Sequence, residues 1–151
     1  MKKILSSTAI LISSLTLVMC TGKSSEVIPV GSVWQVTQME LNGTSVQAPA
    51  EGIPTLGFAD STKIGGNAGC NYYFGNYTIE PTNKIKLNPM GMTRMACPDM
   101  AYESSFIQNL EGVRSYTLKD SVLTLCDSLG KNLMVLAPYK EKVTTEASQQ
   151  E

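Results

Sequence analysis

The sequence contains no histidine among its 151 residues. Without imidazole it cannot build Ser-His-Asp or Cys-His nucleophiles, imidazole general bases or His-ligated zinc sites. Lysine and arginine number 12 against 13 aspartate and glutamate residues, so the formal net charge is −1. Because there is no basic excess to neutralise phosphates, nucleic acid is a poor candidate partner. Any catalysis would have to rely on Asp, Glu, Lys, Tyr or Cys side chains.

One ordinary domain accounts for the chain, since 151 residues can bury roughly two thirds of the surface that the unfolded chain exposes. Hydrophobic residues make up 42% of the sequence and charged residues 17%. These fractions are typical of a folded globule, because a disordered chain would be less apolar and carry a larger net charge. The sequence shows no internal repeat and no second zone of composition. We therefore expect a single domain, and a monomer.

The start of the chain has the pattern of an export signal. Two lysines precede an uncharged apolar stretch, residues 4–19, which is too short and too polar for a membrane span and has the shape of a secretory signal peptide. Residues 17–20 read Leu-Val-Met-Cys and resemble a bacterial lipobox, in which the peptidase cuts before a cysteine whose thiol carries diacylglycerol. We expect a lipoprotein signal peptide at 1–19 and a lipid anchor with palmitate on Cys20. An ordinary signal peptide and an uncleaved anchor are the alternatives.

A lipid anchor would attach the chain to a membrane of the bacterial cell envelope through Cys20. Thr21 rather than aspartate follows the anchor, which resembles the usual signal for delivery to the outer membrane. Residues 20–30 are polar with no core pattern and are interpreted as a tether. Residues 140–151 are also polar and are interpreted as a disordered tail. The folded domain is therefore expected at 31–139.

Short alternating runs dominate the expected domain. Apolar, β-branched and aromatic residues alternate with polar ones, and turn formers such as those at 42–43 and 81–83 separate the runs. This pattern is typical of antiparallel strands that cover one core. The runs lie at 33–36, 55–58, 77–79, 84–87, 116–118, 123–125 and 133–136. They predict about eight strands.

One segment has helical periodicity instead. Its apolar positions recur at intervals of four, four and three residues, at Tyr102, Phe106, Leu110 and Val113. This spacing places them on one helical face. Pro98 suits the first helical position and Gly112 is a plausible end. The predicted fold is mainly β with one helix (α+β), a curved, barrel-like antiparallel sheet packed on a single helix near 98–112.

Two blocks of the sequence resemble the signatures of a known family. Residues 65–78 read GGNAGCNYYFGNYT and are similar to the GCN-x-x-x-G-x-Y block of the META domain, the family of the bacterial heat-shock lipoprotein HslJ. Residues 92–98 read MTRMACP and are followed by Glu103 and Phe106 in the family's E-x-x-F pattern. Trp34 and the later strands also fall in family order, so the resemblance covers nearly the whole expected domain.

The resemblance implies a compact, barrel-like β fold with one helix on a secreted or lipid-anchored protein. It implies a link to envelope stress, antibiotic tolerance or virulence, with no settled catalytic activity. It also marks a set of residues as a structural motif, namely Trp34, Gly69, Asn71, Gly75, Tyr77, Thr93, Arg94 and Phe106. The glycines and asparagines of the first block suit positive φ angles and close backbone approaches in a tight connection or bulge between strands.

The same resemblance implies a disulfide between Cys70 and Cys97, because each lies in a family block. Closing a loop of this length would stabilise the fold by roughly 3.5 kcal/mol in the chain-entropy model. Two adjacent reduced thiols packed as small hydrophobes are the alternative. Cys126 follows Leu125 on a predicted strand, so we expect it to face away from the core as a free, partly accessible thiol. A second disulfide to an unknown partner is the alternative for Cys126.

Four methionines lie close to Cys97 in the sequence, at Met90, Met92, Met95 and Met100. Thioethers beside a thiolate are ligands suited to Cu(I), which makes a copper site one alternative. The preferred interpretation is that these side chains fill irregular space between the helix and the sheet. We therefore expect neither a metal nor a cofactor.

Two further patterns are interpreted as structural. Ser128 and Lys131 match the S-x-x-K of acylating serine enzymes, but they lie in a predicted hairpin turn rather than at a helix start. Asp99 and Glu103 form a carboxylate pair at i,i+4, and we expect them to be a solvated helix face rather than acid–base machinery.

The sequence thus predicts a non-catalytic, lipid-anchored envelope protein that acts as a binding or protective module in stress or antibiotic tolerance. Curved sheets of this size often flank an apolar groove, so an apolar ligand or a protein segment is the expected partner. Inhibition of a secreted protease and Cu(I) binding are the alternatives, and an enzyme is the less favoured one.

Overall fold

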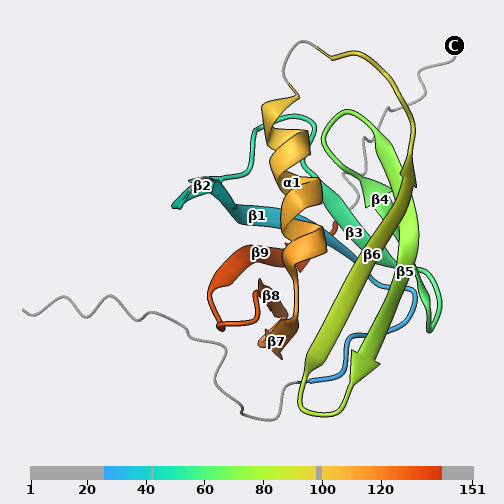
Figure 1. Ribbon diagram of the computed structural model, residues 1–151, viewed down its shortest axis with the longest axis vertical. Coiled ribbons are helices and arrows are strands. Elements are labelled where there is room, and N and C mark those ends of the chain that lie inside the picture. Colours follow the sequence, from blue (N-terminus) through green and yellow to red (C-terminus); the bar gives the residue numbers. More distant parts are fainter. Residues whose placement is uncertain (1–25, 42, 98–99, 141–151) are drawn as a thin grey trace, which may run out of the picture.

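The computed structural model describes residues 26–41, 43–97 and 100–140. Within them the chain forms nine strands and one helix (Figure 1). In chain order these are β1 (Val33–Leu41), β2 (Thr44–Gln47), β3 (Thr55–Phe58), β4 (Lys63–Asn67), β5 (Tyr72–Glu80), β6 (Lys84–Met92), α1 (Ala101–Gly112), β7 (Ser115–Lys119), β8 (Val122–Cys126) and β9 (Asn132–Pro138). The predicted signal peptide, Cys20 and residues 141–151 of the predicted tail lie outside the described residues.

The nine strands form one antiparallel sheet that closes on itself. The strand order is β2-β1-β3-β4-β5-β6-β7-β8-β9, and β1 also pairs with β9. The shortest junction is between β6 and β7, where a single register pair joins Lys84 and Ser115. The sheet is therefore a ring of strands rather than a regular barrel. The predicted curved antiparallel sheet with a single helix is confirmed.

The described residues contain nine strands rather than about eight, because two strands lack an alternating apolar pattern. β2 pairs with β1 and lies outside the ring. β4 runs through the start of the glycine-rich block, which we expected to be a connection. A Cβ atom on Gly66 would overlap the carbonyl oxygen of Thr55 on the neighbouring strand β3. Glycine therefore permits a close backbone approach inside the sheet.

A bulge in β5 explains a second glycine of the block. The register between β5 and β6 shifts between Phe74 and Gly75, as expected for a bulge that increases local twist. An added Cβ atom on Gly75 would overlap the carbonyl oxygen of Asn88 in β6. The long β5–β6 hairpin therefore depends on glycine at this position.

Two tight hairpin turns follow from residues that adopt positive φ angles. Thr82 and Asn83, between β5 and β6, have φ angles of 68° and 61°. Asp120 and Ser121, between β7 and β8, have φ angles of 51° and 59°. Two successive positive φ angles are typical of a type I′ turn, whose twist matches that of the flanking strands. Both turns thus set the register of their hairpins.

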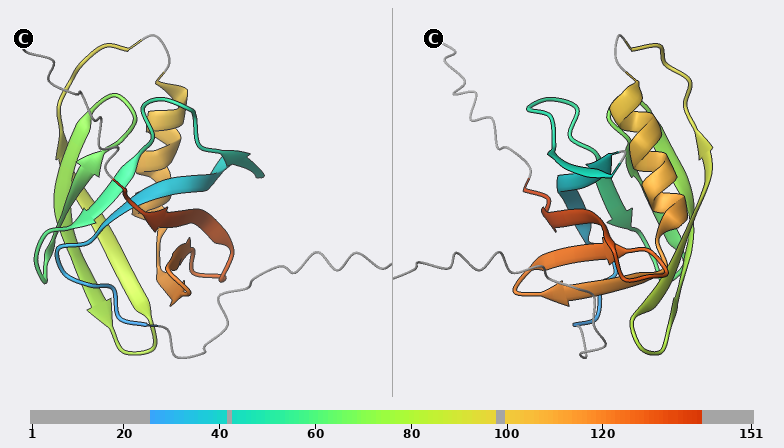
Figure 2. Two further views of the ribbon diagram at one scale, coloured as in Figure 1. Left: turned by 180° about the vertical axis from the view of Figure 1, so that it is seen from behind. Right: turned by 60° about the vertical axis from the view of Figure 1, so that its left-hand side comes forward.

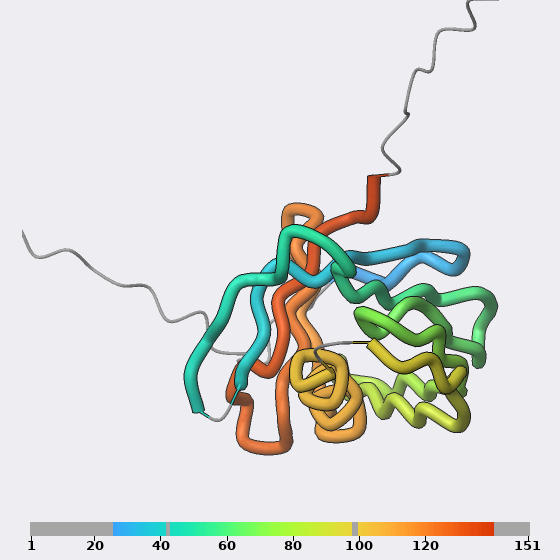
Figure 3. The backbone as a smooth tube through the Cα atoms, turned by 90° about the horizontal axis from the view of Figure 1, so that it is seen from above, coloured from blue at the N-terminus to red at the C-terminus, as the bar shows by residue number. Residues whose placement is uncertain are grey.

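Helix α1 packs across one side of the ring. Its predicted apolar face is buried, with Phe106 and Leu110 both 0% exposed. The helix contacts β6, β1 and β9, and the view along its axis places it between the β5–β6 hairpin and the β8–β9 strands (Figure 3). Figure 2 shows the same helix from the back and from the side. Among the described residues no helix is long and apolar enough to span a membrane.

Aromatic side chains fill much of the core. Trp34 is 5% exposed, and its Nε1 donates a hydrogen bond to Ser32 Oγ at 2.9 Å. Two further pairs of aromatic rings pack edge-to-face. The ring centroids of Phe58 and Tyr77 are 5.0 Å apart, and those of Tyr73 and Phe106 are 5.6 Å apart. The second pair joins β5 to α1, so it docks the helix on the sheet.

Residues 26–30 pack against the domain, which differs from the tether predicted for 20–30. Ile28 is 4% exposed in the core, and the Glu26 N–H donates to the Leu118 carbonyl oxygen at 3.1 Å. Val27 and Val30 are exposed. Ile28 is therefore a single buried side chain among exposed neighbours, and such a segment shows no alternating or helical pattern in the sequence. The folded domain therefore includes residues 26–30.

Candidate functional site

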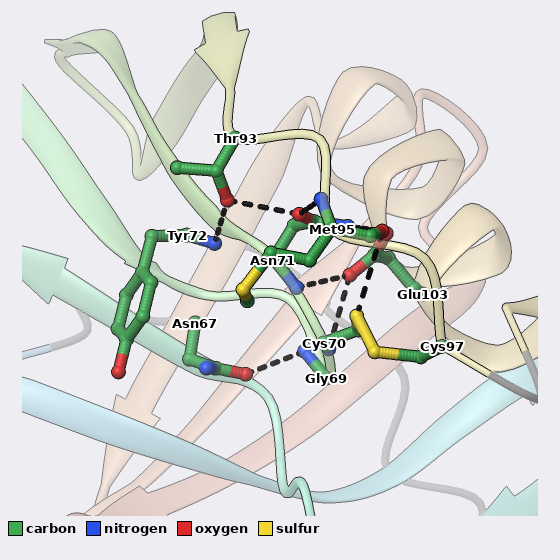
Figure 4. The surroundings of a disulfide bond; sticks show 9 residues. All are labelled: Asn67, Gly69, Cys70, Asn71, Tyr72, Thr93, Met95, Cys97 and Glu103. Carbon is green, nitrogen blue, oxygen red and sulfur yellow. Dashed lines mark hydrogen bonds between the residues drawn. A yellow bond between two sulfur atoms is a disulfide. The ribbon is translucent and has the colours of Figure 1, made fainter.

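Glu103 lies at the centre of a buried polar cluster beside the disulfide (Figure 4). Its side chain comes from the first turn of α1 and the residue is 3% exposed. Oε2 accepts hydrogen bonds from the backbone N–H groups of Cys70 at 3.0 Å and Asn71 at 2.6 Å. Oε1 accepts from Nδ2 of Asn71 at 2.9 Å. One carboxylate of the helix thus holds the connection between β4 and β5.

Asn71 extends this cluster to the segment that follows β6. Its Oδ1 accepts from Thr93 Oγ1 at 2.9 Å and from the Met95 N–H at 2.6 Å. Its Nδ2 donates to the Met95 carbonyl oxygen at 3.2 Å as well as to Glu103. Thr93 Oγ1 in turn accepts from the Tyr72 N–H at 3.1 Å. Asn71 therefore ties three chain segments together through both ends of its amide.

The disulfide between Cys70 and Cys97, implied by the family resemblance, is present and closes the same cluster. Its Cα atoms are 6.3 Å apart and the two cysteines are separated by 27 residues. Gly69 precedes it with a φ angle of 124°, where its N–H donates to Asn67 Oδ1 at 2.6 Å. A φ angle in this region favours glycine. The two family blocks are thus joined by one covalent bond and a shared hydrogen-bond network.

The electrostatics of the cluster keep Glu103 ionised. Burial raises the pKa of Glu103, but the hydrogen bonds from the Asn71 side chain and from the backbone of Asn71 and Cys70 lower it more, so the pKa lies below its usual value of 4.5. The first turn of a helix also favours negative charge. Glu103 is therefore a fixed anion that organises backbone N–H groups.

The prediction that Glu103 belongs to a solvated helix face is wrong. Glu103 precedes Phe106 by three residues and Leu110 by seven, a spacing that puts all three on one helical face. The sequence therefore contained a signal that Glu103 lies on the buried face. A carboxylate on such a face is stable only if hydrogen-bond donors from elsewhere in the chain reach it. The donors come from Cys70 and Asn71, more than thirty residues away. Asp99 lies outside the described residues.

The prediction of a free, accessible thiol at Cys126 is also wrong. Cys126 is 0% exposed and is disulfide-bonded. The pairing of β8 with β9 shifts register between Leu125 and Cys126. Thr124, which precedes the shift, is buried as well, and so are Leu123 and Leu125. Both faces of β8 are therefore covered, and a residue that faces away from Leu125 is not exposed.

The other motif residues have separate structural roles. The Tyr77 hydroxyl donates to the Asp60 carbonyl oxygen at 2.8 Å, and burial together with the Asp60 charge raises its pKa. Arg94 is exposed. Trp34 donates a hydrogen bond to Ser32, two residues earlier in the sequence. The structure therefore brings Gly69, Asn71, Thr93 and Glu103 into one cluster and leaves Trp34 and Tyr77 to other contacts.

Three of the four methionines near Cys97 are on the surface, not between helix and sheet as predicted. Met90, Met92 and Met95 are 61%, 41% and 48% exposed, beside Tyr72 and Phe74 at 61% and 62%. We call these five residues the methionine patch. Tyr72, Phe74, Met90 and Met92 occupy exposed positions of β5 and β6, and Met95 lies in the segment that follows β6. Because the Cys97 sulfur is in a disulfide, the thiolate required by the copper alternative is not available.

A groove of about 440 Å³ opens between β1, β2 and the β8–β9 turn. We call it the β1–β9 groove. Met39, Leu129 and Leu133 are among its apolar lining residues. Its charged lining residues, Glu40 and Lys131, form an ion pair with 3.2 Å between Oε1 and Nζ. The groove therefore presents an apolar surface whose charges compensate each other.

A smaller pocket of about 230 Å³ lies next to the disulfide and is lined partly by Tyr102 and Glu103. The Tyr102 hydroxyl is buried without a hydrogen-bond partner, and burial raises its pKa.

In the part of the chain that the structure describes, no three His, Cys, Asp or Glu side chains are placed to hold a metal ion. Lys131 lies in a turn whose Asp127 N–H donates to its carbonyl oxygen at 3.0 Å, in keeping with the structural interpretation of Ser128 and Lys131.

Comparison with solved structures shows the same fold in two bacterial proteins. An NMR structure of a protein from Burkholderia xenovorans is 20% identical with a TM-score of 0.60, covering 78% of this chain and 96% of that one. The crystal structure of a DUF4847 family protein from Bacteroides vulgatus is 14% identical with a TM-score of 0.51, covering 72% of this chain and 92% of that one. At these identities the likeness concerns the fold alone.

A search among curated proteins finds no match. The model of the META domain family matches residues 26–139. That range starts where the structure places Glu26 and Ile28 on the domain, and it contains both blocks that meet at Asn71 and Glu103. The chain belongs to the META domain family.

Proposed function

We propose that this META domain is a non-catalytic binding module of the bacterial cell envelope, attached to the outer membrane by lipid on Cys20. Its ligand is an uncharged apolar molecule held in the β1–β9 groove. The stress or antibiotic tolerance implied by the family resemblance is the setting that we propose for it. The observation that carries the proposal is the apolar lining of a groove whose two charged residues pair with each other.

The size and chemistry of the groove support an apolar ligand. Small-molecule sites typically have volumes of roughly 300–1,000 Å³ and mainly apolar walls, and the groove of about 440 Å³ falls in this range. Lys131 would attract an anion if it were unpaired, but it lies 3.2 Å from the Glu40 carboxylate. Leu129 is 86% exposed at the rim. Contact with an apolar ligand would remove this side chain from water.

The state of the buried carboxylate supports a non-catalytic role. A general acid or base needs a pKa near the working pH, whereas the pKa of Glu103 is lowered from its usual value. Both of its oxygens already accept hydrogen bonds from Cys70 and Asn71. Glu103 therefore serves the structure of the domain, although it lines a small pocket.

Binding of a neutral fluorescent probe tests the proposal. N-Phenyl-1-naphthylamine emits more strongly in apolar surroundings, and we expect saturable binding to the domain. Leu129→Ser should weaken this binding about tenfold, because burial of a leucine side chain contributes roughly 1.5–3 kcal/mol. Leu129 is 86% exposed in the free protein, so the substitution should leave the melting temperature unchanged.

Val27→Ser is the matched control. Val27 is 79% exposed and is not among the residues that line the groove, so this variant removes a similar exposed apolar side chain elsewhere. It should bind the probe as the parent does. Equal binding by both variants, or no saturable binding by the parent, would contradict the proposed site.

A further inference from the structure

We propose that Met90, Met92 and Met95 form a modification site at which hypohalous acids and related two-electron oxidants convert exposed thioethers to sulfoxides while the domain stays folded. The inference is independent of the apolar ligand proposed above, because the β1–β9 groove is lined by Met39 and Met134 rather than by these three residues. It concerns the methionine patch, which the proposed binding function does not use.

The first observation is the contrast in exposure among the methionines. Met90, Met92 and Met95 are 61%, 41% and 48% exposed, whereas Met39 and Met134 are each 1% exposed. Oxidation requires the oxidant to reach the sulfur, so reactivity follows exposure. Among the described methionines, three thioethers are therefore exposed and two are protected in the core, while Met100 is half-buried.

The second observation is that the backbone holds two of these methionines in place. Met95 is bound at both of its backbone polar groups by the Asn71 side chain, at 2.6 Å to its N–H and 3.2 Å to its carbonyl oxygen. Met90 lies in β6 opposite the shift in register at Gly75. The exposure of the patch is therefore a consequence of the fold, since strand pairing and a buried asparagine direct these residues outward.

The third observation concerns competing groups. Thiolates are the side chains that two-electron oxidants attack most readily, but Cys70 and Cys97 form a disulfide and Cys126 is 0% exposed. Cys70 and Cys97 are joined beside the patch. Within the described part of the chain, the exposed thioethers are therefore the most accessible oxidisable sulfurs.

The chemistry balances with hypochlorous acid as the oxidant. Each thioether R–S–CH₃ reacts with HOCl to give the sulfoxide R–S(=O)–CH₃ and HCl. The sulfur gains one S–O bond and loses two electrons, and chlorine is reduced from the +1 state to chloride. Hydrogen peroxide gives the same sulfoxide with water as the second product. Methionine sulfoxide reductases reverse the modification.

The fold accommodates the product at the patch but not in the core. A sulfoxide is polar, and at an exposed position its oxygen is solvated. At Met90 the Asn76 Nδ2 group, which already donates to the sulfur at 3.2 Å, can donate to the new oxygen. The same oxygen on Met39 or Met134 would be buried without a donor, which is unfavourable.

Titration of the folded full-length chain with hypochlorous acid, followed by peptide mapping, tests the inference. At about three equivalents per described domain we expect sulfoxide at Met90, Met92 and Met95, with Met39 and Met134 at least about tenfold less oxidised. Mapping separates these sites from the methionines that lie outside the described residues. The melting temperature should stay within about 2 °C of the untreated protein. Sulfoxide reductases should restore the original mass.

A triple variant, M90L/M92L/M95L, checks that the patch accounts for the uptake. It should gain about three fewer oxygen atoms than the parent at the same dose. Met134→Leu, a substitution of similar volume in the core, should gain as many as the parent. Oxidation of Met39 or Met134 as early as the patch, or unfolding as the first three sulfoxides form, would overturn the inference. Equal uptake by the triple variant and the parent would overturn it as well.

Discussion

Glu103 shows how a single residue can connect distant parts of this fold. The carboxylate lies in the first turn of α1, yet its donors belong to the connection between β4 and β5. Removal of any partner would leave a buried charge or a buried N–H group without a hydrogen bond, which is more costly than the bond itself is stabilising. The cluster therefore behaves as a unit, with Asn71 as its second essential member.

We expect Glu103→Gln to destabilise the domain by about 1–3 kcal/mol near neutral pH, because an amide cannot accept at both oxygen positions. The parent should also lose stability as the pH falls. The folded pKa of Glu103 lies below the usual value of 4.5, so its contribution is complete above 4.5 and is lost as the pH falls through the folded pKa. Urea unfolding at about pH 7 and about pH 3 measures both effects.

Glu111→Gln on the same helix is the control, because Glu111 is exposed. It should change the free energy of unfolding by no more than about 0.5 kcal/mol. The difference in stability between the two pH values should be smaller in Glu103→Gln than in the parent. An identical pH dependence in these two proteins would show that Glu103 does not hold its charge through the cluster.

At the scale of elements, the docking of α1 depends on an apolar face that the sequence pattern predicts correctly. Phe106 and Leu110 are both 0% exposed, and the Phe106 ring contacts Tyr73 of β5 edge-to-face. The start of the helix differs slightly, since α1 begins at Ala101. Pro98, the predicted first residue, lies outside the described residues.

Phe106→Ala should cost about 3–5 kcal/mol of unfolding free energy through lost burial and the cavity left between α1 and β5. Gln108→Ala, at an exposed position of the same helix, should change it by less than about 0.5 kcal/mol. Denaturant unfolding of both variants measures the difference. If Phe106→Ala unfolded at the same denaturant concentration as Gln108→Ala, the helix would not be docked as the structure shows.

At the scale of the whole molecule, the proposed location depends on Cys20, which precedes the described domain. Replacement of Cys20 by alanine should abolish labelling with a radioactive fatty acid, because the thiol is the site of diacylglycerol attachment. It should also prevent cleavage before residue 20, since the lipoprotein peptidase acts on the lipidated cysteine. Unchanged label on the variant, or a peptide that links Cys20 to Cys126, would contradict lipidation, because a sulfur in a disulfide cannot carry lipid.

The sequence by itself determined those features that depend on local pattern. Alternation of apolar and polar residues predicted most of the strands, and a spacing of three to four residues predicted α1 and its buried Phe106 and Leu110. The resemblance to the META domain added the pairing of Cys70 with Cys97. These features are local in sequence, or are carried by motifs, so they could be recognised without coordinates.

Only the tertiary structure decided the burial of residues whose local sequence pattern does not predict it. Glu103 is stable in the interior because the N–H groups of Cys70 and Asn71 reach it. Ile28 joins the core through backbone pairing near Leu118, and Cys126 is buried because both faces of β8 are covered. The physical reason is common to all three. Burial depends on partners that are distant in sequence, and closure of the sheet through β1 and β9 brings those segments together.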